Sequence, residues 1–227
     1  MIKICGLSDA DALDAALGAG ADMVGFVHFP PSPRHVALDR GARLSAQARG
    51  RALRVALLVD PSDEAAEAVV AALDPDLVQL HGAETPDRVA QLRTLTGRPV
   101  MKAVGVAERG DLAAIETYRG RADRLLVDAK PPKGALLPGG NGVSFDWTLL
   151  AGLDPALPLV LSGGLSADNV AEAVAATGVM GVDVSSGVES RPGVKDPARI
   201  AAFVAAARQA FAHRDSAHYA LKGTRAP

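Results

Sequence analysis

The sequence predicts an α/β protein, a single closed (β/α)8 barrel with eight parallel strands. Short β-branched apolar runs alternate with Ala-rich helical stretches along most of the chain. The apolar runs are continuous, which is typical of parallel strands that are covered on both faces. The chain has 227 residues, and division among eight units leaves about 28 residues for each, close to the length of a βα repeat.

Eight strands are expected from these runs, and helical patterns fill the gaps between them. The expected strands are residues 2–5, 23–27, 54–59, 77–80, 100–104, 124–128, 157–161 and 181–184. The expected helices are residues 9–17, 39–48, 63–73, 86–95, 108–118, 167–176 and 197–212. Ser8 and Asp11 have the spacing of a capping box for the first helix. Thr85 and Pro86 fit the N-cap and first position of the fourth helix.

One barrel domain over residues 1–212 is favoured, followed by a loosely ordered tail at 213–227. The alternative, a doubly wound open sheet, needs a Gly-rich phosphate loop after its first strand, and Cys5-Gly6-Leu7 lacks that pattern. Two connections, 28–36 and 129–144, are longer than usual βα loops. Both follow strands, so both are expected on the catalytic face of a barrel.

Composition excludes several classes of protein. Lys and Arg number 24 against 26 Asp and Glu, for a formal net charge of −2, so we expect no nucleic-acid partner. The single cysteine cannot form an internal disulfide, which favours a reducing, cytoplasmic location. No apolar run is long enough to span a membrane, and the N-terminus lacks a signal-peptide pattern. Without a long apolar stripe, we expect a monomer.

Two glycine- and serine-containing turns predict a phosphate site. Ser162-Gly163-Gly164 follows the seventh strand, and Ser185-Ser186-Gly187 follows the eighth. Glycines let the backbone approach a ligand, and the N-terminus of a following helix offers free N–H groups to an anion. The alternative is a pair of tight turns. Because loops after strands seven and eight often bind phosphate in this fold, we expect a phosphorylated small molecule.

Asp128 and Cys5 both end strands and are therefore expected at the same mouth of the barrel. A partly desolvated carboxyl group such as Asp128 suits general acid–base chemistry, whereas the alternatives are an N-cap or an ion pair with Lys130. A thiolate at Cys5 could act as a base, although buried single cysteines usually fill space in the core.

Arg34 and His81 are further candidates. Three prolines stiffen the loop of Arg34, whose guanidinium can hold a carboxylate in a bidentate pair; the alternative is a solvated loop arginine. His81 follows the fourth strand and either lines the pocket or hydrogen-bonds the barrel rim. The five histidines and the cysteine show no metal-ligand spacing, so no metal site is expected.

Several short motifs occur in a fixed order from residue 2 to about residue 211. They are KICGL (3–7), GFV (25–27) with PSPR (31–34), VQLHG (78–82), LVD (126–128), GGNG (139–142) with FDW (145–147), SGGL (162–165) and GVDVSSGVE (181–189). The ordered set closely resembles the phosphoribosylanthranilate isomerase family of tryptophan biosynthesis. This resemblance implies a (β/α)8 barrel.

The resemblance also implies a reaction, an Amadori rearrangement. N-(5-phosphoribosyl)anthranilate would become 1-(2-carboxyphenylamino)-1-deoxyribulose 5-phosphate. By the resemblance, Cys5 is the general base and Asp128 the general acid. No cofactor is expected, because the substrate nitrogen itself accepts the electrons.

The resemblance assigns the remaining site residues to the substrate. Arg34 would contact the anthranilate carboxylate, and Asp183 would lie near the substrate from inside the eighth strand. The phosphate would be held by Gly163, Gly164, Ser185, Ser186 and Gly187. One departure is Asn141, where Thr or Ser is more usual, and we expect it to tune the loop after the sixth strand.

Two alternatives to this function are weaker. A sister isomerase of histidine synthesis, on the same fold, uses an aspartate at the end of the first strand, where this chain has Cys5. A barrel that only binds or regulates would be expected to lack the acid or the base, and both Cys5 and Asp128 are present.

Overall fold

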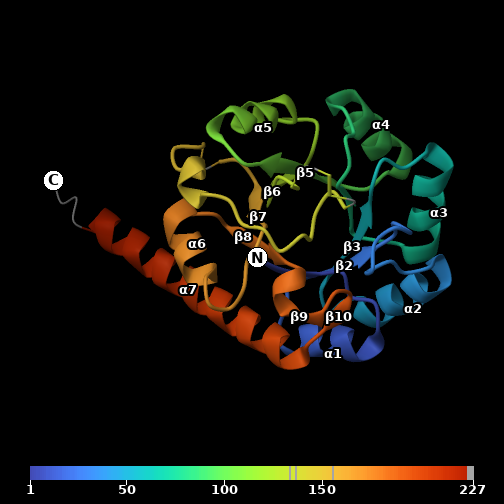
Figure 1. Ribbon diagram of the computed structural model, residues 1–227, viewed down its shortest axis with the longest axis horizontal. Coiled ribbons are helices and arrows are strands. Elements are labelled where there is room, and N and C mark those ends of the chain that lie inside the picture. Colours follow the sequence, from blue (N-terminus) through green and yellow to red (C-terminus); the bar gives the residue numbers. More distant parts are fainter. Residues whose placement is uncertain (133, 136, 155, 224–227) are drawn as a thin grey trace.

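Eight parallel strands, each paired with the next in the chain, close into a barrel where β8 pairs with β1 (Figure 1). The computed structural model describes residues 1–132, 134–135, 137–154 and 156–223, the stretch 216–223 by its backbone alone. The predicted fold class is confirmed. The strands are β1 (Ile2–Cys5), β2 (Met23–Val27), β3 (Leu53–Leu58), β4 (Leu77–Leu80), β5 (Val100–Val106), β6 (Arg124–Ala129), β7 (Leu159–Leu161) and β8 (Gly181–Val184).

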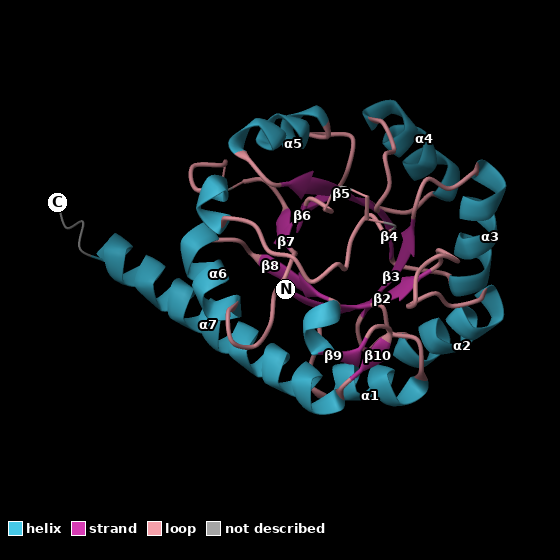
Figure 2. Ribbon diagram, viewed as in Figure 1, coloured by secondary structure: helices cyan, strands magenta, loops and turns pink. Residues whose placement is uncertain are grey.

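Helices surround the barrel, as Figure 2 shows. The α-helices are α1 (Ala10–Gly18), α2 (Leu38–Ala48), α3 (Asp63–Leu73), α4 (Pro86–Thr96), α5 (Ala113–Thr117), α6 (Val170–Thr177) and α7 (Pro197–Gly223). Three 3-10 helices are η1 (Arg109–Leu112), η2 (Trp147–Leu150) and η3 (Ser186–Val188). Among the described residues between β6 and β7, η2 is the one helical segment, so the long loop there is free to cover the barrel mouth.

Most expected elements are present; most differences from expectation lie at their ends, and one expected helix is divided. The helix over 63–73 and the Thr85 cap of α4 are confirmed. The first helix is capped by Asp9, whose side chain accepts a hydrogen bond from the Ala12 N–H, so the predicted Ser8 cap is wrong. The expected helix at 108–118 is divided into η1 and α5. β7 begins at Leu159, two residues later than expected.

Two apolar layers account for the continuous apolar strands. Inside the barrel lies a buried cluster formed by Met23, Val55, Leu77, Met101, Ala103, Leu126 and Val160. A larger cluster fills the space between the outer faces of the strands and the helices, and it includes Ile4, Val24 and Phe203. Each strand is therefore buried on both faces, which is why it does not alternate between apolar and polar residues.

Helix α7 packs against α1 and α6 and continues well beyond the barrel wall (Figure 1). Its backbone remains helical to Gly223, so the expected boundary at residue 212 falls inside a helix. Residues 224–227 of the expected tail lie outside the described residues. The loose order predicted for the tail stays a prediction.

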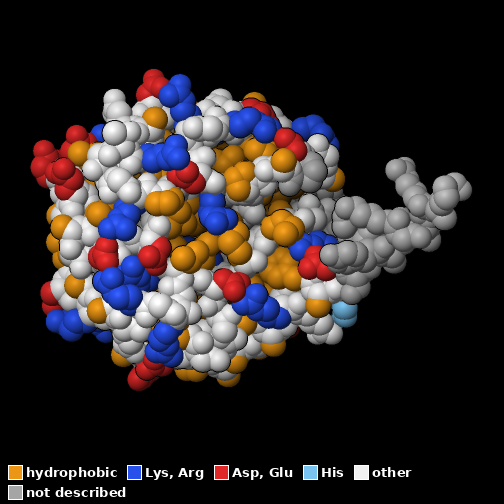
Figure 3. Space-filling model, turned by 180° about the vertical axis from the view of Figure 1, so that it is seen from behind, with side chains coloured by type: hydrophobic (Ala, Val, Ile, Leu, Met, Phe, Trp, Pro, Cys, Tyr) orange, Lys and Arg blue, Asp and Glu red, His pale blue; other side chains and the backbone are white. Residues whose placement is uncertain are grey.

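The face opposite to the one seen in Figure 1 carries both hydrophobic and charged side chains. Figure 3 shows hydrophobic side chains gathered near the centre of this face, with charged side chains among and around them. The large exposed apolar residues of the described chain are Leu53, Leu95, Val143, Met180 and Val194. Among the described residues, no helix is long and apolar enough to cross a lipid bilayer.

Phe203 tests the packing of α7, because its ring is fully buried between the helix and the barrel. We expect Phe203→Ala to lower the free energy of unfolding by about 3–5 kcal/mol, since it loses buried apolar area and leaves a cavity. Urea unfolding followed by circular dichroism measures the loss. Gln209→Ala, on the exposed side of α7, should change it by less than about 0.5 kcal/mol. Equal effects of the two variants would contradict this packing.

Candidate active site

All ten residues expected at the site line one cavity at the carboxyl ends of the strands. The barrel brings these residues together because parallel strands all end at one rim. The residues are Cys5, Arg34, His81, Asp128, Gly163, Gly164, Asp183, Ser185, Ser186 and Gly187.

Cys5 is a free, buried thiol at the end of β1. It shares the inner side of the strand with Lys3, two positions earlier. A Cβ atom on Gly25, the partner of Cys5 on β2, would lie 3.0 Å from Cys5 Sγ and 3.2 Å from Lys3 Cε. Glycine at this position therefore leaves room for both side chains. Burial raises the pKa of the Cys5 thiol, while the nearby Lys3 ammonium acts in the opposite direction.

Lys3 and Asp183 form a buried ion pair beneath the thiol. Lys3 Nζ donates to Asp183 Oδ1 at 2.7 Å, and both side chains are at most 5% exposed. Ser162 Oγ donates to the other carboxylate oxygen at 3.3 Å. Burial by itself would lower the pKa of Lys3, but the Asp183 carboxylate raises it above its ordinary value. Lys3 therefore stays a cation, and Asp183 faces inward as expected.

Asp128 lies on the opposite side of the mouth and contacts His81. Asp128 Oδ2 is 3.2 Å from His81 Nε2, and Oδ1 accepts a hydrogen bond from the Ala129 N–H at 2.9 Å. Lys130 forms its ion pair with Asp111 instead, so the alternative of an Asp128–Lys130 pair is wrong. His81 lines the cavity, and its other ring nitrogen, Nδ1, is 3.0 Å from Gln79 Nε2.

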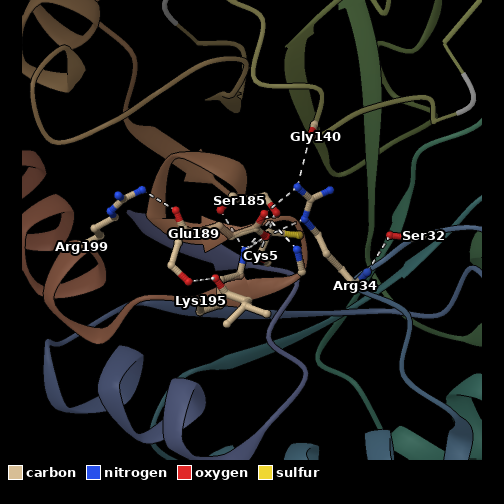
Figure 4. Close-up of polar contacts among 11 residues, drawn as sticks. Cys5, Ser32, Arg34, Gly140, Ser185, Glu189, Lys195 and Arg199 are labelled. Atoms are coloured by element: carbon tan, nitrogen blue, oxygen red, sulfur yellow. Dashed lines mark hydrogen bonds and ion pairs between the residues drawn. The ribbon is translucent and has the colours of Figure 1, made fainter.

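Arg34 is 6% exposed, so the alternative of a solvated loop arginine is wrong. Its Nε and Nη2 donate to the two carboxylate oxygens of Glu189 at 2.7 and 3.0 Å (Figure 4). Nη2 also donates to the Gly140 carbonyl at 3.2 Å. The expected bidentate pair is thus formed with a carboxylate of the chain itself. Nη1 makes no hydrogen bond to any described residue, so this nitrogen remains for a ligand.

Glu189 and Lys195 belong to the site, although neither was among the candidates. They lie on a short antiparallel hairpin, β9 (Glu189–Arg191) and β10 (Val194–Lys195), that follows β8 and η3. Lys195 Nζ donates to Glu189 Oε1 at 2.8 Å and to the Ser185 carbonyl at 2.9 Å. Burial lowers the pKa of Lys195, against the pull of Glu189. Glu189 ends the last sequence motif, which was a usable signal, whereas Lys195 lies in no motif.

Arg34, Glu189 and Lys195 therefore form a buried group of two cations and one anion, visible in Figure 4. Burial by itself would raise the pKa of Glu189, but its contacts with Arg34 and Lys195 lower it. The carboxylate is thus ionised and shared between the two cations. The positive charge that remains lies at the rim of the cavity, where it favours an anionic ligand.

The two turns expected to bind phosphate lie against each other. A Cβ on Gly187 would be 1.9 Å from the Leu165 carbonyl oxygen, so the side chain of any other residue would separate the turns. No described residue accepts a hydrogen bond from the backbone N–H of Gly163 or Gly164. Helix α6 begins at Val170 and not at the expected residue 167. The exposed amides of the turn, more than the helix end, are therefore suited to bind an anion.

The loop after β6 covers the mouth of the barrel. A Cβ on Gly139 would lie 2.4 Å from His81 Nε2 and 2.8 Å from Asp128 Oδ2. The loop backbone can approach the two polar side chains this closely only because residue 139 is glycine. Asn141 donates to the Leu137 carbonyl at 3.1 Å, a contact within the loop. Its expected effect on the loop stays a prediction.

The functional groups of the site are those of its own side chains and backbone amides. In the part of the chain that the structure describes, no group of three or more His, Cys, Asp or Glu side chains could hold a metal ion. The arrangement offers a thiol and a carboxyl group on opposite sides of one cavity. It also offers a guanidinium nitrogen and backbone amides for anions.

Comparisons with known proteins point to one family. A family model described as N-(5'phosphoribosyl)anthranilate (PRA) isomerase matches residues 2–206. A relative from Azorhizobium caulinodans, named N-(5'-phosphoribosyl)anthranilate isomerase, is 59% identical over 93% of this chain and 92% of its own length. A relative of the same name from Brucella canis is 56% identical and covers 93% and 95% of the two chains.

Solved structures with this fold agree with the sequence relatives. The crystal structure of phosphoribosyl anthranilate isomerase from Thermotoga maritima is similar with a TM-score of 0.83 and 33% identity. Another crystal structure shows phosphoribosyl anthranilate isomerase in complex with reduced 1-(o-carboxyphenylamino)-1-deoxyribulose 5-phosphate, with a TM-score of 0.80 and 32% identity. Each covers 92% of this chain and 98% of the solved chain.

Removal of the Glu189 charge tests the buried ion group. In Glu189→Gln, two buried cations lose their shared counter-ion, so we expect the free energy of unfolding to fall by about 3–5 kcal/mol. Urea unfolding measures the change. The matched control is Asp39→Asn, which removes an ion pair with Arg43 whose side chains are 70% and 72% exposed, and it should cost less than about 1 kcal/mol. Equal losses would mean that the Glu189 group is effectively solvated.

The thiol of Cys5 gives a test of its electrostatic environment. Only the thiolate is alkylated, so the alkylation rate rises about tenfold per pH unit until the pH passes the pKa of the thiol. Burial raises the pKa of Cys5. The pH at which its rate of alkylation by iodoacetamide reaches half of the maximum should therefore lie above that of a free cysteine, about 8.5. N-acetylcysteine serves as the reference thiol. A half-maximal pH below that of N-acetylcysteine would mean that the Lys3 ammonium lowers the pKa of the thiol by more than burial raises it.

Proposed function

The chain belongs to the N-(5'-phosphoribosyl)anthranilate isomerase family, and from this we propose the reaction that it catalyses and the residues responsible. The substrate is N-(5-phosphoribosyl)anthranilate, and the product is 1-(2-carboxyphenylamino)-1-deoxyribulose 5-phosphate, within tryptophan biosynthesis. The observation that carries the proposal is that a thiol, Cys5, and a carboxyl group, Asp128, line the same cavity. An acid and a base on opposite sides of a sugar are what an aldose–ketose isomerisation requires.

Asp128 is the general acid that opens the ribose ring. Its proton passes to the ring oxygen, the bond from C1′ to that oxygen breaks, and the substrate nitrogen donates its electron pair to form a protonated Schiff base. After this step, Asp128 is left as a carboxylate. The Ala129 N–H and the nearby His81 ring support this role, because both can donate hydrogen bonds to the carboxylate oxygens.

Cys5 is the general base that completes the isomerisation. Its thiolate removes the proton from C2′, and the electron pair of the C–H bond moves toward the nitrogen and forms an enolamine. Transfer of a proton to C1′ and loss of the O2′ proton then give the ketone. Lys3 supports this role because its buried ammonium favours the thiolate. The substrate nitrogen supplies the electron sink, so no cofactor enters the reaction.

The carboxylate and the phosphate of the substrate bind to different parts of the cavity. Arg34 Nη1 is available for the anthranilate carboxylate, while Nε and Nη2 remain with Glu189. The amides of Gly163 and Gly164, with Ser185, Ser186 and Gly187, hold the phosphate. Support comes from the similar crystal structure, whose bound compound carries both a carboxyphenyl group and a phosphate. Asp183 and His81 line the same cavity, and we assign to them the contacts with the sugar.

We also propose that the enzyme acts as a monomer in the cytoplasm. The single cysteine suits a reducing compartment. Size-exclusion chromatography with light scattering tests the monomer, since a second copy would double the measured mass.

The decisive test of the function is an assay that follows the loss of phosphoribosylanthranilate fluorescence. The wild-type chain should turn over the substrate. Asp128→Asn and Cys5→Ser should each lower kcat by about 10²–10⁴-fold, because each keeps the shape of the side chain but removes a transferable proton or an accessible anion. Circular dichroism verifies that both variants fold. Turnover close to wild type in a folded variant would remove that residue from the mechanism.

A further inference from the structure

Gln79 is a buried side chain for which the proposed reaction gives no role. It lies on β4, in register with Leu57 on β3 and Met101 on β5, and it is 0% exposed. Both of these strand partners are apolar and buried. An amide in such surroundings loses the hydrogen bonds of water, so burial is unfavourable unless its polar atoms find partners.

Only one end of the Gln79 amide has a partner. Its Nε2 is 3.0 Å from His81 Nδ1, whereas Oε1 makes no hydrogen bond to any described residue. A methionine of similar shape would leave no orphaned oxygen, so packing alone does not explain the glutamine. The contact with His81 is what the side chain contributes.

The amide nitrogen of Gln79 can only donate, so in this contact Nδ1 of a neutral His81 ring is the acceptor. A neutral imidazole has one N–H, and its other nitrogen is an acceptor. When Gln79 donates to Nδ1, the ring proton must be on Nε2. Nε2 is also the nitrogen that lies 3.2 Å from Asp128 Oδ2, so it faces the carboxyl group as a donor.

The opposite tautomer would direct a lone pair at Asp128. Two acceptors would then face each other when Asp128 is ionised, because Nε2 and Oδ2 both carry lone pairs. The backbone of Gly139 covers the same contact, which leaves little room for water to separate the two groups. A defined tautomer is therefore needed each time Asp128 loses its proton.

We propose that Gln79 is a positioning residue for the isomerisation, holding His81 in the Nε2–H tautomer so that it donates to the Asp128 carboxylate formed on ring opening. The inference rests on the proposed function, since it requires Asp128 to be the acid. Gln79 also lines the cavity, and the proposal is that its effect passes through His81 and not through a contact with the substrate.

Kinetics of Gln79→Met test this role. Methionine has nearly the same shape but cannot donate to Nδ1. We expect kcat to fall about 10–100-fold, the loss seen when a partner that orients a metal-ligating histidine is removed, with KM nearly unchanged. Gln91→Met, an exposed position on α4, is the matched control and should leave both constants unchanged. A rise in KM alone would indicate a substrate contact and would overturn the proposal.

A double-mutant cycle separates positioning from an independent effect. In His81→Gln, an amide replaces the imidazole, and its NH2 group can donate to Asp128 whichever residue occupies position 79. We therefore expect Gln79→Met to lower kcat much less in the His81→Gln background than in the wild type. The same fold-change in both backgrounds would mean that Gln79 does not act through His81, and would overturn the proposal.

Nitrogen NMR of histidine-labelled protein reads the tautomer directly. The His81 signals are identified by their loss in His81→Gln, and the wild type should show the proton on Nε2. Gln79→Met, or Gln79→Leu if the methionine variant does not fold, should show a mixture. A wild-type proton on Nδ1 would overturn the proposal. This measurement does not depend on turnover. A wild-type protein without activity would refute the proposed function, whereas the NMR spectrum would still report the tautomer of His81.

Discussion

The buried ion pair between Lys3 and Asp183 joins the first and last strands of the barrel, and the active site lies directly above it. Lys3 is on β1 and Asp183 on β8, so the pair spans the seam where the first and last strands meet. Removal of two charges from water is costly and is offset only by close geometry and further hydrogen bonds. Here Ser162 from β7 supplies such a bond. The pair thus joins three neighbouring strands, and it places a fixed cation beside Cys5.

Charge is distributed unevenly around the mouth. On one side, Arg34 and Lys195 share the carboxylate of Glu189, which leaves excess positive charge near the phosphate turns. This side of the mouth therefore attracts an anion. A substrate with a carboxylate and a phosphate suits this distribution.

Glycines allow the loop after β6 and the turns after β7 and β8 to pack closely around the polar groups of the site. Polar groups on different strands must approach a small ligand and also be shielded from water. Gly139 lets the loop backbone come down onto His81 and Asp128, and Gly187 lets the two turns at β7 and β8 touch. The Arg34 contact with the Gly140 carbonyl holds the loop in this position. Shielding strengthens the electrostatic interactions inside the cavity, because water no longer screens them.

Local patterns in the sequence determined the barrel and the identity of most site residues. Continuous apolar runs indicate strands that are buried on both faces, and the residue that ends each run lies at the rim; this is how Cys5 and Asp128 could be found. Helix caps such as Thr85 could be read for the same reason, since they depend on residues a few positions apart.

Only the tertiary structure decided which side chains are partners. Lys3 and Asp183 are 180 positions apart, and Arg34 and Glu189 are 155 apart. Their contacts depend on the register of strand pairs and on the closure of the barrel, to which no local pattern corresponds. The guanidinium of Arg34, expected to hold a ligand carboxylate, therefore proved to hold the carboxylate of Glu189 through Nε and Nη2. Gln79 and Lys195 likewise gained partners only when distant strands and the hairpin came together, because hydrogen bonds are short and directional and require the folded geometry.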